Sequence, residues 1–270
     1  RAMSFVFAER ERVETRVLGA LRCVDAVTGT PVGRAMELRA DGADILLNRS
    51  GLHIIRRVDA LAAHEASFDT PPVLPAIGSL QLTLTVSDPL GVYLPRRATL
   101  ALPRDPDPAN SAAPNSLFRP AELPLFPSPS APVAVNWAVL RVSVAASTGE
   151  SLGGALLRVL RNGNVLGQGL SDWRGEALVP VAGVPVTTFS EDENSVVSNE
   201  IDVVLQVIFD PATGQRTPAA QVRNGRPPAT LPQVDPLALE AAANTLPGTT
   251  RNIAIAARRV QTLTLSVPLP

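Results

Sequence analysis

The feature that most constrains the fold is a series of short apolar segments, separated by turn signals, within residues 138–181. Leu140, Val142 and Val144 alternate with polar residues, which indicates a strand with one buried and one exposed face. Farther along, the dipeptide Asn162-Gly163 predicts a two-residue hairpin turn, because both of its residues adopt positive φ at low cost. Short strands joined by tight turns are typical of β-sandwiches.

A second turn signal follows the hairpin. Asp172 is suited to accept hydrogen bonds from the turn backbone, and Gly175 is suited to supply an unusual backbone dihedral. A further apolar segment follows at 177–179, so this part of the chain is predicted to contain four short strands.

The order of these motifs is similar to that of a known domain family. Residues 148–177 contain T-G-x-x-L-G-G-A-x-L-x-V, then the hairpin, then S-D-x-x-G-E-A. This order resembles the carboxypeptidase-regulatory-like, or transthyretin-like, domain. The resemblance implies a seven-stranded, prealbumin-type and Ig-like β-sandwich that acts as a non-catalytic appendage, linker or adhesive unit. It implies an architecture rather than an activity.

The first half of the chain repeats this pattern. Four of its small or turn-forming residues recur in the second half at one fixed offset: Thr28, Gly29, Gly33 and Ala35 correspond to Thr148, Gly149, Gly153 and Ala155. Alternating segments at 80–86 and 201–209 are each followed by an Asp-Pro turn. Self-similarity of this kind predicts a duplicated structural unit.

The two halves also end on similar apolar strands, at 98–102 and 262–267. We therefore predict an all-β chain of two homologous sandwiches, at 13–104 and 134–270. An N-terminal arm at 1–12 precedes them.

A proline-rich segment separates the two predicted sandwiches. Residues 103–133 hold nine prolines, which exclude a helix and disfavour central strands. A linker at 105–133 is therefore predicted to run extended, partly as polyproline II. Several of its side chains are too apolar for a solvated tether and are candidate contacts with a domain surface or a partner protein: Phe118, Leu123, Leu125 and Phe126.

The second sandwich carries two predicted insertions, 187–200 and 210–252. Within the longer one, Asp235 is a candidate N-cap, followed by proline at the first helical position and then by alanines. A short helix is therefore predicted at 235–244. Because long loops are often functional, we expect this insertion to cover one end or edge of the sandwich and to make contacts.

The shorter insertion contains three consecutive acidic residues, Glu191, Asp192 and Glu193. Loop carboxylates bind Ca²⁺ where about six to eight oxygen ligands converge, but this spacing does not match an EF-hand. We interpret the cluster as a solvated loop and a candidate protein contact rather than a metal site.

Trp137 and Trp173 are the two tryptophans of the chain. Together with Tyr93 they could form a sugar-binding platform, and packing against a domain edge or a turn is the alternative role. We therefore include both tryptophans among the candidate contact residues.

No catalytic, metal-binding or cofactor-binding residue is predicted. His53 and His64 lack the spacing of a zinc site, and a site at His64 with Glu65 and Asp69 is disfavoured because neighbours on a strand point apart. No serine lies in a G-x-S-x-G motif. Cys23 is interpreted as a small buried strand residue, and as the single cysteine it cannot form an intrachain disulfide.

Charge and hydropathy exclude other partner classes. All 24 basic residues are Arg, a bias that we attribute to a GC-rich bacterial or phage genome, and the formal net charge is −1. A nucleic-acid partner would require a concentrated positive field, so none is predicted. No apolar run is long enough to span a bilayer, so no membrane insertion is predicted. Met3 is interpreted as the native start without a signal peptide, which favours cytoplasmic synthesis with assembly into a particle over secretion.

Three functional hypotheses follow. The first is a non-catalytic structural protein with protein partners, a building block of a bacterial or phage-derived assembly, with a phage-tail-like contractile particle as the preferred setting. The alternative is a cell-surface adhesion or carbohydrate-binding module. The weakest is a regulatory domain separated from a hydrolase, because two linked sandwiches occupy the whole chain.

Overall fold

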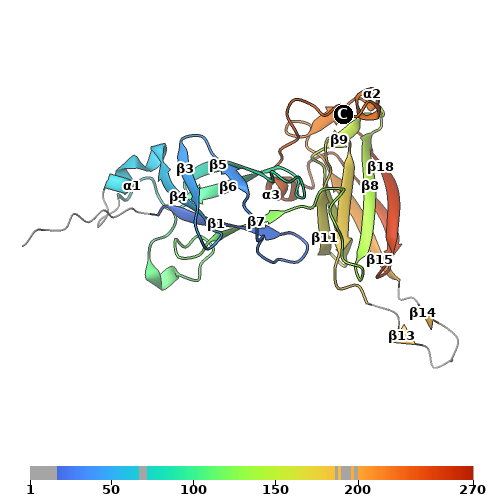
Figure 1. The fold of residues 1–270 in the computed structure, drawn as a ribbon, viewed down its shortest axis with the longest axis horizontal. Coiled ribbons are helices and arrows are strands. Elements are labelled where there is room, and N and C mark those ends of the chain that lie inside the picture. The colour runs from blue at the N-terminus through green and yellow to red at the C-terminus, as the bar shows by residue number, and fades with distance from the viewer. Residues whose placement is uncertain (1–16, 67–71, 186–187, 190–195, 198–199, 270) are drawn as a thin grey trace, which may run out of the picture.

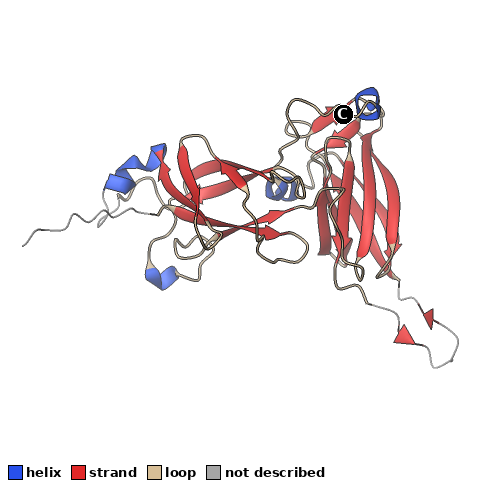
Figure 2. Ribbon diagram, in the orientation of Figure 1, coloured by secondary structure: helices blue, strands red, loops and turns tan. Residues whose placement is uncertain are grey.

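The computed structural model describes residues 17–66, 72–185, 188–189, 196–197 and 200–269. Strands account for 45% of the structure and helices for 9%, which confirms the predicted all-β class. The strands form two units, one before Phe126 and one after Trp137 (Figures 1 and 2).

The first unit is a sandwich of two sheets. One sheet has the strand order β3-β4-β1-β7, and the other has the order β2-β5-β6. The strands are β1 (Gly19–Asp25), β2 (Glu37–Arg39), β3 (Ala43–Leu47), β4 (His53–Val58), β5 (Leu80–Ser87), β6 (Arg96–Leu102) and β7 (Ala121–Leu125). Apolar side chains alternate along them, so one face of each sheet contributes to a shared core in which Leu21, Ile55 and Leu84 are fully buried.

The second unit also contains two main sheets. One has the order β11-β10-β15-β17. In the other, β8 pairs with β12, β18 and β9, and β9 pairs with β16. The strands are β8 (Ala138–Ala146), β9 (Ser151–Gly153), β10 (Leu156–Arg161), β11 (Asn164–Leu170), β12 (Glu176–Val181), β15 (Ile201–Ile208), β16 (Gln215–Thr217), β17 (Gly248–Ile255) and β18 (Val260–Val267). A separate ribbon consists of β13 (Thr188–Phe189) and β14 (Val196–Val197).

Short helices lie in the connections. They are η1 (Asp59–Leu61), α1 (Ala62–Ala66), η2 (Pro108–Asn110), α2 (Ala219–Arg223) and α3 (Pro236–Ala241). The predicted helix in the long insertion is confirmed as α3: Asp235 Oδ1 accepts the N–H of Leu237 at 3.1 Å, and Pro236 occupies the first turn. The helix ends at Ala241, before the predicted Asn244.

The two units share their pattern of strand pairing. In each unit the last strand lies parallel to the first, β7 beside β1 and β18 beside β8. The first strand also pairs antiparallel with β4 in one unit and with β12 in the other. The facing sheets contain β2-β5-β6 and β10-β15-β17 in matching order. One strand differs, because β3 pairs with β4 whereas its counterpart β11 pairs with β10 across the sandwich.

The structure corrects the prediction that residues 105–133 form an extended linker. Residues 121–125 within it form β7, the closing strand of the first sandwich, and Leu125 of this strand is fully buried. Pro124 is tolerated because β7 lies at a sheet edge, with β1 as its neighbour on one side. The first sandwich therefore extends to Leu125, and the counterpart of β18 is β7 rather than the strand predicted at 98–102.

The turns predicted in the second sandwich are confirmed. Asn162-Gly163 has φ values of 51° and 80°, as a tight hairpin turn between β10 and β11 requires. Asp172 Oδ1 accepts the N–H groups of Arg174 at 2.8 Å and Glu176 at 3.0 Å, and Gly175 has φ of 75°.

Candidate interaction sites

The two sandwiches meet at a buried apolar cluster, which we call the junction. Phe126, just after β7, shares this cluster with Leu156 and Ile208 of the second sandwich and with Val234 and Leu239 of the long insertion. All five side chains are buried. Burial of apolar surface stabilises at about 25 cal/mol per Å², so the junction holds the two units against each other.

Arg96 of β6 adds polar contacts to the junction. Its side chain is 1% exposed and donates hydrogen bonds to the carbonyl oxygens of Pro124 at 2.6 Å and Arg97 at 2.9 Å. It lies 5.9 Å from the ring centre of Phe126 and forms an ion pair with Asp235, with Nη2 and Oδ1 3.4 Å apart. Burial lowers the pKa of Arg96 to about 10, and the attraction of Asp235 opposes that shift.

The long insertion contacts the first sandwich through two adjacent residues. Asp235 Oδ2 accepts the hydroxyl proton of Thr99 at 3.1 Å, and the carbonyl oxygen of Val234 accepts the N–H of Arg97 at 2.8 Å. β6 is an edge strand whose free side would otherwise expose backbone groups. The insertion packs on its own sandwich, where Glu240 of α3 binds Arg158 of β10, and it also covers an edge of the other sandwich.

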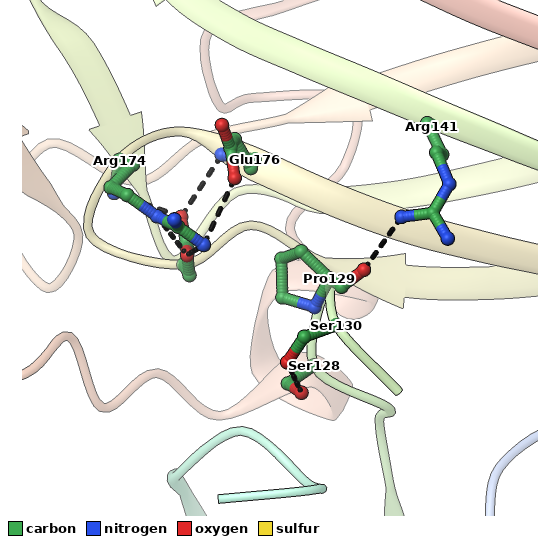
Figure 3. Close-up of polar contacts among 7 residues, drawn as sticks. Ser128, Pro129, Ser130, Arg141, Arg174 and Glu176 are labelled. Carbon is green, nitrogen blue, oxygen red and sulfur yellow. Dashed lines mark hydrogen bonds and ion pairs between the residues drawn. The ribbon is translucent and has the colours of Figure 1, made fainter. Parts of the chain in front are cut away.

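The segment that follows β7 is hydrogen-bonded to both sandwiches. In the first sandwich, Leu94 donates its N–H to the carbonyl oxygen of Phe126 at 2.9 Å, and the carbonyl oxygen of Val92 accepts the N–H of Ser128 at 2.7 Å. On the other side, Arg141 of β8 donates from Nη1 to the carbonyl oxygen of Pro129 at 2.7 Å (Figure 3). This connection therefore runs along protein surface rather than through solvent.

A groove of about 290 Å³ lies beside this segment, lined by residues of both sandwiches, of the connection and of the long insertion. Among them are Asp88, Tyr93, Ser130, Trp173 and Leu231. Because the groove is formed where the units meet, it is the place where a ligand could contact both.

Two of the charged side chains that line this groove, Asp172 and Arg174, bond to each other. Arg174 binds Asp172 at 2.8 Å and Glu176 at 2.9 Å through Nη2 (Figure 3). Ser128 and Ser130 lie with their Oγ atoms 3.2 Å apart. Among the described residues that line the groove there is no histidine or cysteine, so the serines have no neighbouring imidazole to accept a proton.

The three aromatic residues of the predicted sugar platform are not brought together. Trp173 precedes the start of β12, whereas Trp137 lies near its other end, where Ala138 pairs with Val181. Tyr93 shares the groove with Trp173, but the guanidinium of Arg34 lies 5.0 Å from its ring centre. One face of the tyrosine is therefore already covered.

The other candidate contact residues fall into three groups. Leu123, Leu125 and Phe126 are buried within this chain, because the first two face the core of the first sandwich and the third is in the junction. Phe118 is 57% exposed and remains available to a partner. The acidic residues Glu191, Asp192 and Glu193 lie outside the described residues.

Cys23 is buried in β1, and burial raises the pKa of its thiol to about 11. It therefore stays protonated and unreactive near neutral pH. His53 is also buried, with Nε2 3.0 Å from the carbonyl oxygen of Met36. Within the part of the chain that the structure describes, no three His, Cys, Asp or Glu side chains are grouped to hold a metal ion.

A second groove, which the sequence did not indicate, lies at the end of the first sandwich near α1. It is mainly apolar, and its lining includes Val73, Ile77 and Leu117. Val73 is 89% exposed. The available signal was the proline-flanked apolar run at 72–77, which lacks both the strand alternation and the polar composition of an ordinary loop.

No protein-family model matches this chain, and no curated protein has a matching sequence. Among the described residues, no helix is both long enough and apolar enough to cross a membrane.

Proposed function

We propose that this protein is a non-catalytic structural protein, a building block of a larger bacterial or phage-derived assembly. The observation that carries the proposal is the junction, where the cluster around Phe126 and the ion pair of Arg96 with Asp235 fix one sandwich against the other. A subunit of a particle must keep its two domains in a fixed arrangement, which the junction does. Binding modules on a tether are usually joined by solvated linkers instead.

The surfaces of the chain support contact rather than chemistry. Around the inter-sandwich groove, Asp172 and Arg174 are engaged with each other, so their charges are already compensated. At the other end of the first sandwich, Val73 and Ile77 expose apolar surface of the kind that marks protein contacts. A phage-tail-like contractile particle is the setting that we propose within this class.

Carbohydrate binding is the competing proposal, and one observation favours it. Trp173 and Tyr93 line the same groove, beside the carboxylates of Asp88 and Asp172, and aromatic rings next to polar groups suit sugar rings. We rank it second because Asp88 already accepts the N–H groups of Leu90, Val92 and Tyr93.

Fractionation of the native source separates the proposals. We expect antibodies against the chain to detect it in high-mass fractions of a sedimented lysate, together with a discrete particle visible by electron microscopy. Detection only at the mass of the free chain would contradict the structural proposal.

A glycan array tests the alternative. Binding that is lost in Trp173→Ala and retained in Trp137→Ala would support a sugar site in the groove, because Trp137 lies outside it. Hydrolysis of an ester, peptide or glycoside by the purified chain would contradict the non-catalytic assignment.

A further inference from the structure

The second sandwich has one strand with a free side. Among the described residues, β18 pairs with β8 alone, parallel to it and in a continuous register of eight residue pairs. Figure 1 shows β18 in red at the outer side of this sandwich. The opposite side of the strand is therefore open to a further strand.

The backbone of β18 directs hydrogen-bonding groups to this open side. The N–H of Val139 bonds to the carbonyl oxygen of Arg259, and the N–H of Ser147 bonds to that of Val267. The odd-numbered residues of β18 therefore face β8 with their backbone groups. Because these groups alternate between the two sides of a strand, those of the even-numbered residues point to the open side. The even-numbered residues are Val260, Thr262, Thr264 and Ser266.

The sequence of β18 lacks the features that usually keep an edge strand from pairing. It contains no charged residue, no proline and no glycine. The other edge strands of the four main sheets, within the described residues, differ in this respect. A charged residue lies in each of β2, β3, β7, β16 and β17, β6 is covered by the long insertion, and β11 pairs through a bulge.

We propose that β18 binds β18 of a second copy of this chain, antiparallel and around a two-fold axis. The alternation of its side chains suits this partner. Leu265 and Val267 are buried and Leu263 is half-buried, whereas Thr262 and Thr264 are exposed. Two such strands continue both faces of the sheet across the axis, so the apolar side chains stay on the core side and the hydroxyls stay outside.

The backbone also favours one register. With the axis at Leu263, Thr262 lies opposite Thr264 of the second copy, and Val260 lies opposite Ser266. Every outward N–H of the strand then meets a carbonyl oxygen. An axis at Thr264 would instead place Val260 opposite Pro268, which has no N–H.

The uncharged sequence explains why the partner is an identical strand. A charged edge strand paired with its own copy brings like charges together, whereas β18 opposes threonine with threonine and leucine with leucine. Pairing also buries apolar surface of Val260, which is 57% exposed, and of Leu263. The inference goes beyond the proposed function, because the pair forms whether or not the chain enters a particle.

Sedimentation equilibrium of the purified full chain tests the proposal. We expect twice the chain mass of 28.4 kDa in the micromolar range. Thr262→Lys with Thr264→Lys should sediment as a monomer, because it places like charges opposite each other. Gln81→Lys with Thr83→Lys is the matched control. It adds the same charge at the same spacing to exposed positions of β5 in the other sandwich, and it should remain a dimer.

Thr264→Pro tests whether the backbone makes the contact. It removes an N–H that points to the open side and leaves the bonds to β8 in place, so we expect a folded monomer. Circular dichroism and thermal unfolding would check the fold. A monomeric wild-type chain, or a folded Thr264→Pro variant that remains a dimer, would overturn the proposal.

Disulfide trapping tests the register. Copies with Thr262→Cys, mixed with copies with Thr264→Cys and treated with diamide as the two-electron oxidant, should form covalent dimers. Either variant alone should form far fewer, because its cysteines do not lie opposite each other. Cys23 is buried and does not interfere. Equal yields of covalent dimer in all three samples, or none in the mixture, would contradict the proposed pairing.

Discussion

Arg96 of the first sandwich and Asp235 of the second form an ion pair whose side chains are 1% and 15% exposed. The same carboxylate caps α3 through Leu237 and accepts a hydrogen bond from Thr99. One acidic side chain therefore starts a helix, compensates a buried guanidinium and bonds a neighbouring sheet.

Asp235→Ala should lower the free energy of unfolding by about 3 kcal/mol, because it leaves a buried charge without its partner and removes a helix cap. Urea denaturation followed by tryptophan fluorescence would measure the loss, since both tryptophans belong to the second unit and its connection. Glu37→Ala is the control. Its ion pair with Arg39 is solvent-exposed, so no measurable change is expected.

Leu125→Ala should destabilise the first sandwich by about 3 kcal/mol, because it leaves a cavity beneath β7. Phe118→Ala removes a larger but exposed side chain from the same proline-rich segment, and its effect on the unfolding midpoint should be small. Similar midpoints for both variants would show that β7 is not part of the sandwich.

Gly175→Ala should cost more stability than Gly149→Ala. Both glycines have positive φ, which costs an alanine about 1–2 kcal/mol. At Gly175 the added Cβ would also lie 2.3 Å from the carbonyl oxygen of Val144, whereas at Gly149 nothing lies within 4 Å. Thermal unfolding of the two variants would compare them, and equal midpoints would contradict the steric argument.

Stability should fall as the pH rises above 9. Burial raises the pKa of Cys23 from 9.0 to about 11, so above pH 9 the unfolded chain releases a proton that the folded chain retains. The loss is at most about 1.4 kcal/mol per pH unit. Denaturation midpoints at pH 8, 9 and 10 would measure it, and Cys23→Ala should flatten the dependence.

Tyr93 and Arg96 limit the pH range in which the effect of Cys23 on stability can be measured. The pKa of Tyr93 is raised from 10.0 to about 12, chiefly by burial and then by its hydrogen bond to Asp25. The stability that Tyr93 contributes is therefore also lost as the pH rises above 10. The pKa of Arg96 is lowered to about 10, so its effect on the free energy of unfolding has the opposite sign and favours the folded state as the pH rises. The effect of Cys23 is therefore best separated from those of Tyr93 and Arg96 below pH 10. An equal decline in Cys23→Ala would assign the effect to another group.

Short-range sequence signals correctly predicted the turns and the short helix of the second sandwich. Asn162-Gly163 and the Asp172 turn are fixed by backbone and side-chain chemistry within a few residues, and Asp235 caps a helix that begins next to it. Such features depend little on the rest of the fold.

The features that were missed depend on residues far apart in the chain. Proline density suggested a linker, but Pro124 sits in an edge strand because β1, a hundred residues earlier, supplies the one neighbour it needs. The partner of Asp235 is Arg96, from the other sandwich, and no spacing rule connects them. The groove near α1 likewise combines Val17, Ile77 and Leu117 from three separate segments.

The parallel placement of first and last strands has a mechanical consequence. Because β8 and β18 run in the same direction, a tension applied to the two ends of that sandwich would act along their hydrogen-bonded ladder, and all the bonds would share the force. This ladder joins eight residue pairs, whereas the one between β1 and β7 joins five and includes a proline without an N–H. Under load the first sandwich should therefore yield before the second.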